Sequence, residues 1–345
     1  MIRDRVSAYP FAALTDTGLV RETNEDRYAI SAFHSEFDRR APGILAVLSD
    51  GVGGESGGEV AASLAVDSIL RHVREGLSED PIEVLPEAIR EANENILQKV
   101  NEQPALEGMA ATVACAWISG QTLHIATLGD SRIYLLRNPD QIVQLSTDHT
   151  WVQEAIDSGA ILPEEKENHP RAHVIRRFLG SETPPEADMH IHLPDSSEPD
   201  EVTLLPGDIV FLCTDGCSDL VNAREIRQHF AGQKLEKSLE EIKKLAFDRG
   251  GRDNITMIAI QVPAKLNAKH KPGRWIGWGL AILAVILAVA VGFYLGWRNQ
   301  SSIVNATSTA AFTPQQFSGT QTPVSFTPTA LSGVQPELTA QPIKH

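Results

Sequence analysis

The chain has 345 residues, enough for one large domain or two ordinary ones, and its composition (42% hydrophobic, 22% charged) is typical of globular proteins. Its formal net charge of −15 provides no basic excess to neutralise phosphates, which excludes a general nucleic-acid binder. The three cysteines show no CxxC spacing, and this indicates reduced thiols in a cytosolic domain.

Residues 5–262 alternate strand-like and helix-like segments without a Pro/Ser-rich interruption, so we expect one domain. Apolar runs bounded by turn residues predict strands near 11–14, 28–33, 44–48, 112–119, 122–128, 132–137, 141–145, 201–205, 208–214 and 254–262. Helical spacing predicts helices over 57–75, 81–100, 223–230 and 239–249 and one starting near 148, whereas the polar stretch 160–172 is typical of a mobile loop. Short connections between strands favour antiparallel hairpins, and the predicted fold class is therefore α+β, with antiparallel sheets covered by helices.

The C-terminal part differs in composition. Residues 276–296 carry no charge over about 21 positions, the length of a helix that crosses a bilayer. Trp275 and Trp297 flank this run, and four basic residues precede it in a linker, residues 263–274, against one just after it. We expect a single transmembrane helix over 275–297, with the N-terminal domain in the cytoplasm. The Ser/Thr/Pro-rich tail, residues 298–345, is then disordered and extracytoplasmic. A buried core helix is the alternative.

Four aspartates stand at the ends of predicted strands beside glycine or a turn: Asp50 after ILAVLS, Asp130 after HIATLG, Asp215 after VFLCT, and Asp253 before NITMIAI. A single aspartate in this setting most often caps a helix or a turn. Four in one domain favour another interpretation, because a carboxylate at the end of a buried strand needs a partner or a metal. If these strand ends converge, they form an oxygen-rich site for Mg²⁺ or Mn²⁺.

One basic residue and a pair of acidic residues precede the first of these aspartates. Arg21 stands four residues before the pair Glu25–Asp26. The arginine forms either a simple surface salt bridge or, beside a metal site, a bidentate contact with a phosphate.

Six short motifs occur in a fixed order along the chain. They are RxxxED (21–26), DGxGG (50–54), GMxxT (108–112), GDSR (129–132), TDG (214–216) and GGRDN (250–254). In this order they resemble the metal-dependent serine/threonine protein phosphatases of the PPM (type 2C) family, in their bacterial form, over roughly residues 15–262. The resemblance implies an αββα sandwich of two central, mainly antiparallel β-sheets flanked by helices.

The resemblance also implies a two-metal site for Mn²⁺ or Mg²⁺. By position, Asp50 bridges the two ions and the carbonyl of Gly51 binds one of them. Asp215 and Asp253 then hold the first metal, and Asp26 holds the second. Two such cations lower the pKa of a bridging water, which attacks phosphorus in line.

The remaining positions have secondary roles in the family pattern. Asp130, with Asp215 and Asp219, corresponds to a weaker third metal site, and Arg21 binds the substrate phosphate. Val52 departs from the pattern because some relatives have at this position a histidine proposed as the general acid, and Glu55 stands where many have histidine.

The resulting hypothesis is a membrane-anchored hydrolase that removes phosphate from phosphoserine and phosphothreonine in proteins. Its partners are phosphorylated Ser/Thr proteins, including membrane Ser/Thr kinases whose signalling it would reverse, and it binds no nucleic acid. Two alternatives stay open: a phosphatase for a phosphorylated sigma-factor regulator, and a non-catalytic scaffold that binds phosphoproteins at the membrane.

Overall fold

The computed structural model describes residues 7–34, 41–53, 57–76, 79–137, 141–166, 169–195 and 197–264, all of which belong to one compact unit, residues 1–269. None of the helices formed by these residues combines the length and the apolar character that crossing a membrane requires. The predicted transmembrane helix 275–297, the tail 298–345 and most of the linker 263–274 lie outside the described residues.

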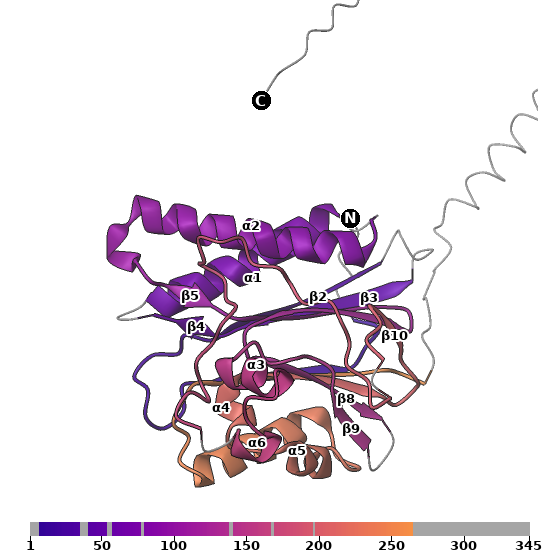
Figure 1. The fold of residues 1–345 in the computed structure, drawn as a ribbon. Helices are drawn as coiled ribbons and strands as arrows, with labels where there is room; N and C mark the ends of the chain where they lie inside the picture. The colour runs from indigo at the N-terminus through magenta and orange to yellow at the C-terminus, as the bar shows by residue number, and fades with distance from the viewer. Residues whose placement is uncertain are drawn as a thin grey trace, which may run out of the picture. The chain divides into compact units, whose positions relative to one another are not determined.

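The described strands form two five-stranded sheets and one short ribbon, and every pairing is antiparallel (Figure 1). The first sheet has the order β1 (Phe11–Asp16), β12 (Ile255–Gln261), β11 (Ile209–Cys213), β8 (Arg132–Arg137) and β9 (Gln141–Gln144). The second has the order β10 (Val202–Thr203), β7 (Thr122–Leu128), β6 (Val113–Ser119), β3 (Pro42–Ser49) and β2 (Arg27–His34). The ribbon pairs β4 (Gly51–Val52) with β5 (Ala110–Ala111).

Helices cover the outer faces of both sheets (Figure 1). The long helices α1 (Gly57–Glu75) and α2 (Pro81–Glu102) lie over the second sheet, and α4 (Asp215–Ser218), α5 (Ala223–His229) and α6 (Leu235–Asp248) lie on the first. The remaining helical segments are α3 (Trp151–Asp157) and the 3₁₀ turns Pro104–Leu106 and Pro163–Glu165. The predicted αββα layering is therefore confirmed.

The alternation of side chains along β3 explains the layers. Successive residues of a strand point to opposite faces of its sheet. Ile44, Ala46 and Leu48 enter the apolar layer between the sheets, while Leu45 and Val47 pack under α1 and α2. A third apolar layer lies between the first sheet and α5 and α6. Strand β3 is buried on both faces, so its carboxyl end is held rigidly.

Two details differ from the sequence-based expectation. The turn at Pro206–Gly207 exists, with Gly207 at a φ of 93°, but it connects β10 of the second sheet to β11 of the first. The two strands flanking it therefore pair with different partners. Helix α3 begins at Trp151, where the Thr150 side chain accepts a hydrogen bond from the backbone N–H of Gln153 and caps the first turn.

Candidate metal centre

The four aspartates predicted at strand ends converge at one edge of the sandwich. Asp50 follows β3, Asp215 follows β11, Asp130 lies in the turn between β7 and β8, and Asp253 precedes β12. Burial raises the pKa of Asp50 well above its usual range, and the carboxylates of Asp26, Asp215, Asp130 and Asp253 raise it further. Direct contacts join these segments, since Thr214, next to Asp215, donates a hydrogen bond to Asp26, and a Cβ at Gly216 would lie 3.4 Å from the Cβ of Asp253.

Asp26 is the most deeply buried of these acids, with 2% of its surface exposed. Its Oδ2 accepts a hydrogen bond of 3.0 Å from Thr214 Oγ1, which in turn accepts one of 3.0 Å from the backbone N–H of Thr256. Its Oδ1 is buried and accepts no hydrogen bond from the described part of the chain. Burial, and secondarily the charge of Asp215, raises the pKa of Asp26 to about 7.

Thr112, from the GMxxT motif, fixes the backbone of Asp50. Its backbone N–H donates to the Asp50 carbonyl at 2.8 Å, and its hydroxyl accepts from the Asp50 N–H at 3.0 Å. The Thr112 and Ser131 hydroxyls, 2.7 Å apart, form a further buried hydrogen bond. The motif was noticed in the sequence, but this positioning role was not assigned.

Gly51 is confined between neighbouring backbones. A Cβ at this position would lie 2.1 Å from the carbonyl oxygen of Gly58, at the start of α1, so only glycine fits. The residue follows Asp50 directly in the chain, and its carbonyl oxygen lies close to Gly58 at the start of α1.

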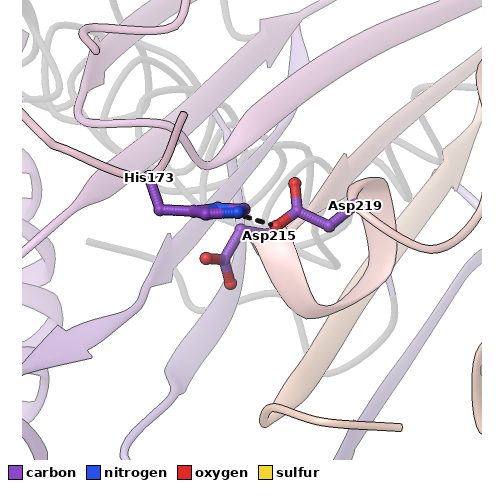
Figure 2. A group of neighbouring side chains, drawn as sticks. All are labelled: His173, Asp215 and Asp219. Carbon is purple, nitrogen blue, oxygen red and sulfur yellow. Dashed lines mark ion pairs between the residues drawn. The ribbon is translucent and has the colours of Figure 1, made fainter. Parts of the chain in front are cut away.

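Asp215 and Asp219 extend the site on and just after the short helix α4. Together with His173 they offer three ligand atoms within 4.8 Å of one another, and His173 Nδ1 lies 3.1 Å from Asp219 Oδ2 (Figure 2). Burial raises the pKa of Asp215 to about 6, with further contributions from Asp219 and Asp253. The Oδ1 atom of Asp215 is buried without a hydrogen-bond partner among the residues described.

His173 was not among the candidate site residues identified from the sequence. Its side chain is exposed, and the loop after α3 brings it against Asp219 at the acidic edge. The predicted member Asp130 is 8% exposed, and burial, followed by the charges of Asp215 and Asp148, raises its pKa to about 8.

Arg21 reaches the same edge from the N-terminal loop. Its Nη2 lies 2.7 Å from Asp253 Oδ2, and its side chain is 53% exposed. Of the two interpretations open from the sequence, the salt bridge is therefore present. Its partner, Asp253, is itself a proposed metal ligand and lies at the edge of the sandwich where the aspartates converge, which is called the metal edge below. The guanidinium has five N–H donors, and its described contacts use only Nη2.

Asn254 holds this loop in place and was also given no role from the sequence. Its Nδ2 donates to the carbonyls of Thr17 and Thr23 at 3.0 and 2.9 Å, and its Oδ1 accepts from the N–H of Glu25 at 2.8 Å. One side chain thus fixes the loop that carries Arg21.

The site therefore fits hard divalent cations. Its donors are carboxylate and carbonyl oxygens, the ligands that Mg²⁺ and Mn²⁺ prefer. The two buried oxygens without partners, on Asp26 and Asp215, are accounted for by cations, which would also offset the repulsion that raises the acid pKa values. Val52, beside Asp50, is 44% exposed and offers no proton-transferring group, while Glu55 lies outside the described residues.

Sequence comparison finds serine/threonine phosphatases among the relatives of this chain. The serine/threonine protein phosphatase PstP of Mycobacterium tuberculosis is 33% identical over 253 residues, which is 73% of this chain but only 45% of that protein. The chain thus spans less than half the length of this relative. The serine/threonine phosphatase stp of Listeria innocua is 31% identical over 252 residues, covering 72% of this chain and 93% of the other.

Solved structures show the same fold. A crystal structure of the M. tuberculosis phosphatase PstP/Ppp superposes with a TM-score of 0.63 at 32% identity, covering 74% of this chain and 99% of that one. The catalytic domain of PstP in complex with two manganese ions gives a TM-score of 0.61 at 32% identity, covering 74% and 98%.

The Protein phosphatase 2C family profile matches residues 22–244. This range includes Asp26, Asp50, Asp130, Asp215 and Asp219, whereas Arg21 and Asp253 lie outside it and are placed at the site by the structure. The match covers more than half of the sequence, and the chain therefore belongs to the protein phosphatase 2C family.

Proposed function

We propose that the protein hydrolyses phosphoserine and phosphothreonine in proteins with the help of divalent cations. The observation that carries this proposal is the convergence of Asp26, Asp50, Asp130, Asp215 and Asp253 at one edge of the sandwich, where burial and neighbouring carboxylates raise the pKa values of the first four. Family membership supports the same activity, because the named relatives are serine/threonine phosphatases.

Five residues would hold two Mn²⁺ or Mg²⁺ ions. Asp50 would bridge them, the Gly51 carbonyl would bind one, Asp215 and Asp253 would complete the first and Asp26 would bind the second. When bound, such a pair of cations supplies an activated water for in-line attack and neutralises the phosphoryl oxygens. Thr112 and Thr214 contribute by keeping Asp50 and Asp26 in fixed orientations.

Arg21 would orient the substrate. Its exposed guanidinium lies at the metal edge, held there by Asp253, and its free N–H donors can bind two oxygens of a phosphate at once. Asp130 and Asp219, with Asp215, would form a weaker third cation site, where His173 adds a nitrogen ligand.

We further propose that the catalytic domain is anchored at the inner face of a membrane by a helix over residues 275–297, with the tail 298–345 on the other side. The charge-free run and its basic flank support this assignment. Anchoring would concentrate the enzyme near phosphorylated membrane proteins, including Ser/Thr kinases.

The direct test compares phosphothreonine and phosphotyrosine peptides, with Mn²⁺ and with EDTA in its place. We expect phosphate release from the phosphothreonine peptide that requires Mn²⁺ and is much slower from phosphotyrosine. Tight binding of the phosphothreonine peptide without turnover, in the presence of Mn²⁺, would contradict the proposal and favour a binding scaffold.

A further inference from the structure

Residues 169–177 form an exposed basic segment in a strongly acidic protein. The sequence HPRAHVIRR contains five basic or titratable cationic side chains and no acid, although the whole chain has a net charge of −15. Arg171, His173, Arg176 and Arg177 are all exposed. A cationic surface on such a chain needs an explanation beyond solubility, because the rest of the surface already supplies ample charge.

The segment runs along the metal edge. At its middle, His173 pairs with Asp219 at 3.1 Å. Just beyond its end, Leu179 exchanges backbone hydrogen bonds of 2.8 and 3.1 Å with Ala111, which precedes Thr112, the residue that fixes Asp50. Arg177 is four residues from His173, and four residues span at most about 14 Å. Its guanidinium therefore lies within reach of a peptide bound at the site.

Two arginines of the segment form no ion pair with a carboxylate in the part of the chain that the structure describes. Arg176 pairs with Glu154 at 3.2 Å, and His173 is engaged by Asp219. Neither Arg171 nor Arg177 makes an ion pair with any residue in the described ranges, whereas Arg27, Arg71, Arg90, Arg132, Arg137 and Arg249 each pair with an acid of the chain. The two are thus available to an external anion.

Trp151 holds the beginning of the segment in a fixed conformation. The rings of His169 and Trp151 stack with centroids 4.8 Å apart, and the Arg171 guanidinium lies 4.8 Å from the centre of the Trp151 ring. The Trp151 backbone N–H donates to the carbonyl of Val174 at 2.8 Å. A guanidinium held by an aromatic face keeps its N–H donors for another ligand and loses less conformational freedom on binding it.

We propose that Arg171 and Arg177 form a docking surface that selects phosphopeptides with carboxylate side chains three or four residues from the phosphorylated residue. The inference rests on the proposed phosphatase function and specifies its substrate class. Three or four extended residues of a bound peptide span about 10–13 Å. This length is comparable with the span of at most about 14 Å between His173, at the metal edge, and Arg177. The attraction between the two arginines and an acidic peptide would favour capture of the substrate, and it would therefore raise kcat/KM.

The test uses two phosphothreonine peptides that differ only in having Glu or Gln at the third and fourth positions on each side. The full-length protein with Mn²⁺ should give a kcat/KM about three- to tenfold higher for the Glu peptide, as expected for a pair of exposed ionic contacts. The double variant Arg171→Gln/Arg177→Gln should lower this ratio to about one. The matched control is Arg74→Gln, an exposed arginine on α1 with no described ion pair, and it should keep the wild-type ratio.

Charge reversal gives a second readout, which a merely structural role would not produce. The double variant Arg171→Glu/Arg177→Glu should prefer a peptide with Lys at the same positions over the Glu peptide. In the wild type, the preference for Glu should also shrink as KCl rises from low to high concentration, because exposed charge pairs are screened by salt.

Two negative outcomes are distinguishable. If wild-type protein hydrolyses both peptides at equal rates, or if the double variant keeps the wild-type preference, the docking surface is wrong and the phosphatase function stands. If neither these peptides nor p-nitrophenyl phosphate is hydrolysed with Mn²⁺, the proposed function fails and this inference fails with it.

Discussion

At the scale of single residues, the metal edge depends on uncharged side chains as much as on the acids. Thr112, Thr214 and Asn254 each use several hydrogen bonds to fix a carboxylate or the loop that carries one. A carboxylate crowded by others would otherwise turn away into solvent, because repulsion opposes its native position. These three residues therefore set the geometry in which cations can bind.

Asn254→Ala tests this positioning role. The substitution leaves two carbonyls and one N–H of the N-terminal loop without their partner, which should lower the free energy of unfolding by about 2 kcal/mol and lower kcat/KM for a phosphothreonine peptide several-fold, since the loop carries Arg21. Asn222→Ala, which removes the N-cap of α5, should cost about 1 kcal/mol and leave kcat/KM unchanged. A full wild-type rate in Asn254→Ala, measured with saturating Mn²⁺, would contradict the role.

The sequence analysis selected the acidic residues but not the uncharged residues that hold them in position, and the reason is physical. Aspartates at strand ends stand out because buried strands rarely end in isolated charges, whereas Thr112 and Thr214 resemble any other strand residue. His173 could not be predicted either. Its position depends on the bridge between Thr150 and Ile175, which returns the loop to the metal edge, and no local spacing signals that contact.

At the scale of the elements, a buried ion pair joins β8 to the segments that follow it. Asp148, 2% exposed, accepts two hydrogen bonds from Arg132 of the GDSR motif, at 2.8 and 2.6 Å, and one from Lys166 at 3.0 Å. Burial alone would raise the pKa of Asp148, but the two cations outweigh it, and the pKa is lowered overall.

This arrangement predicts a pH-dependent stability. Asp148→Asn should lower the free energy of unfolding by about 3 kcal/mol near neutral pH, because it leaves Arg132 largely buried without its counter-charge. The contribution is complete above the ordinary aspartate pKa of about 3.9 and is lost as the pH falls through the lower pKa of the folded state. Urea unfolding in EDTA at pH 6 and pH 3 should therefore show a large difference between wild type and variant at pH 6 and a smaller one at pH 3. Equal stability of the two proteins at pH 6 would exclude this contribution.

Local patterns predicted the elements better than their pairing. The hairpin-length connections predicted antiparallel sheets covered by helices, the family resemblance implied that there are two of them, and residues 57–75 form the predicted helix. The predicted strands 201–205 and 208–214 leave Pro206–Gly207 as a short connection between them, but turn chemistry is local. The assignment of β10 and β11 to different sheets depends on packing between distant parts of the chain.

At the scale of the whole molecule, the sequence predicts a catalytic domain and a membrane segment in separate parts of the chain. The described residues account for the fold and the site, and the anchor over 275–297 stays a prediction from composition. If it is correct, the full chain should remain in the membrane fraction after a carbonate wash, and a chain ending at residue 264 should be in the soluble fraction. Recovery of the full chain as a soluble protein would contradict the anchor, since about 21 charge-free residues would otherwise partition into lipid.

The central claim is that the carboxylates at the strand ends form a cation-dependent phosphatase centre, and a single ligand tests it most directly. The rate of Mn²⁺-dependent phosphate release from a phosphothreonine peptide is measured for wild type, Asp50→Asn and the control Asp67→Asn, an exposed aspartate on α1. Because Asp50 would touch both ions, Asp50→Asn should lose about 100-fold or more of the rate, whereas Asp67→Asn should keep it. A wild-type rate in Asp50→Asn would contradict the assignment of the metal centre.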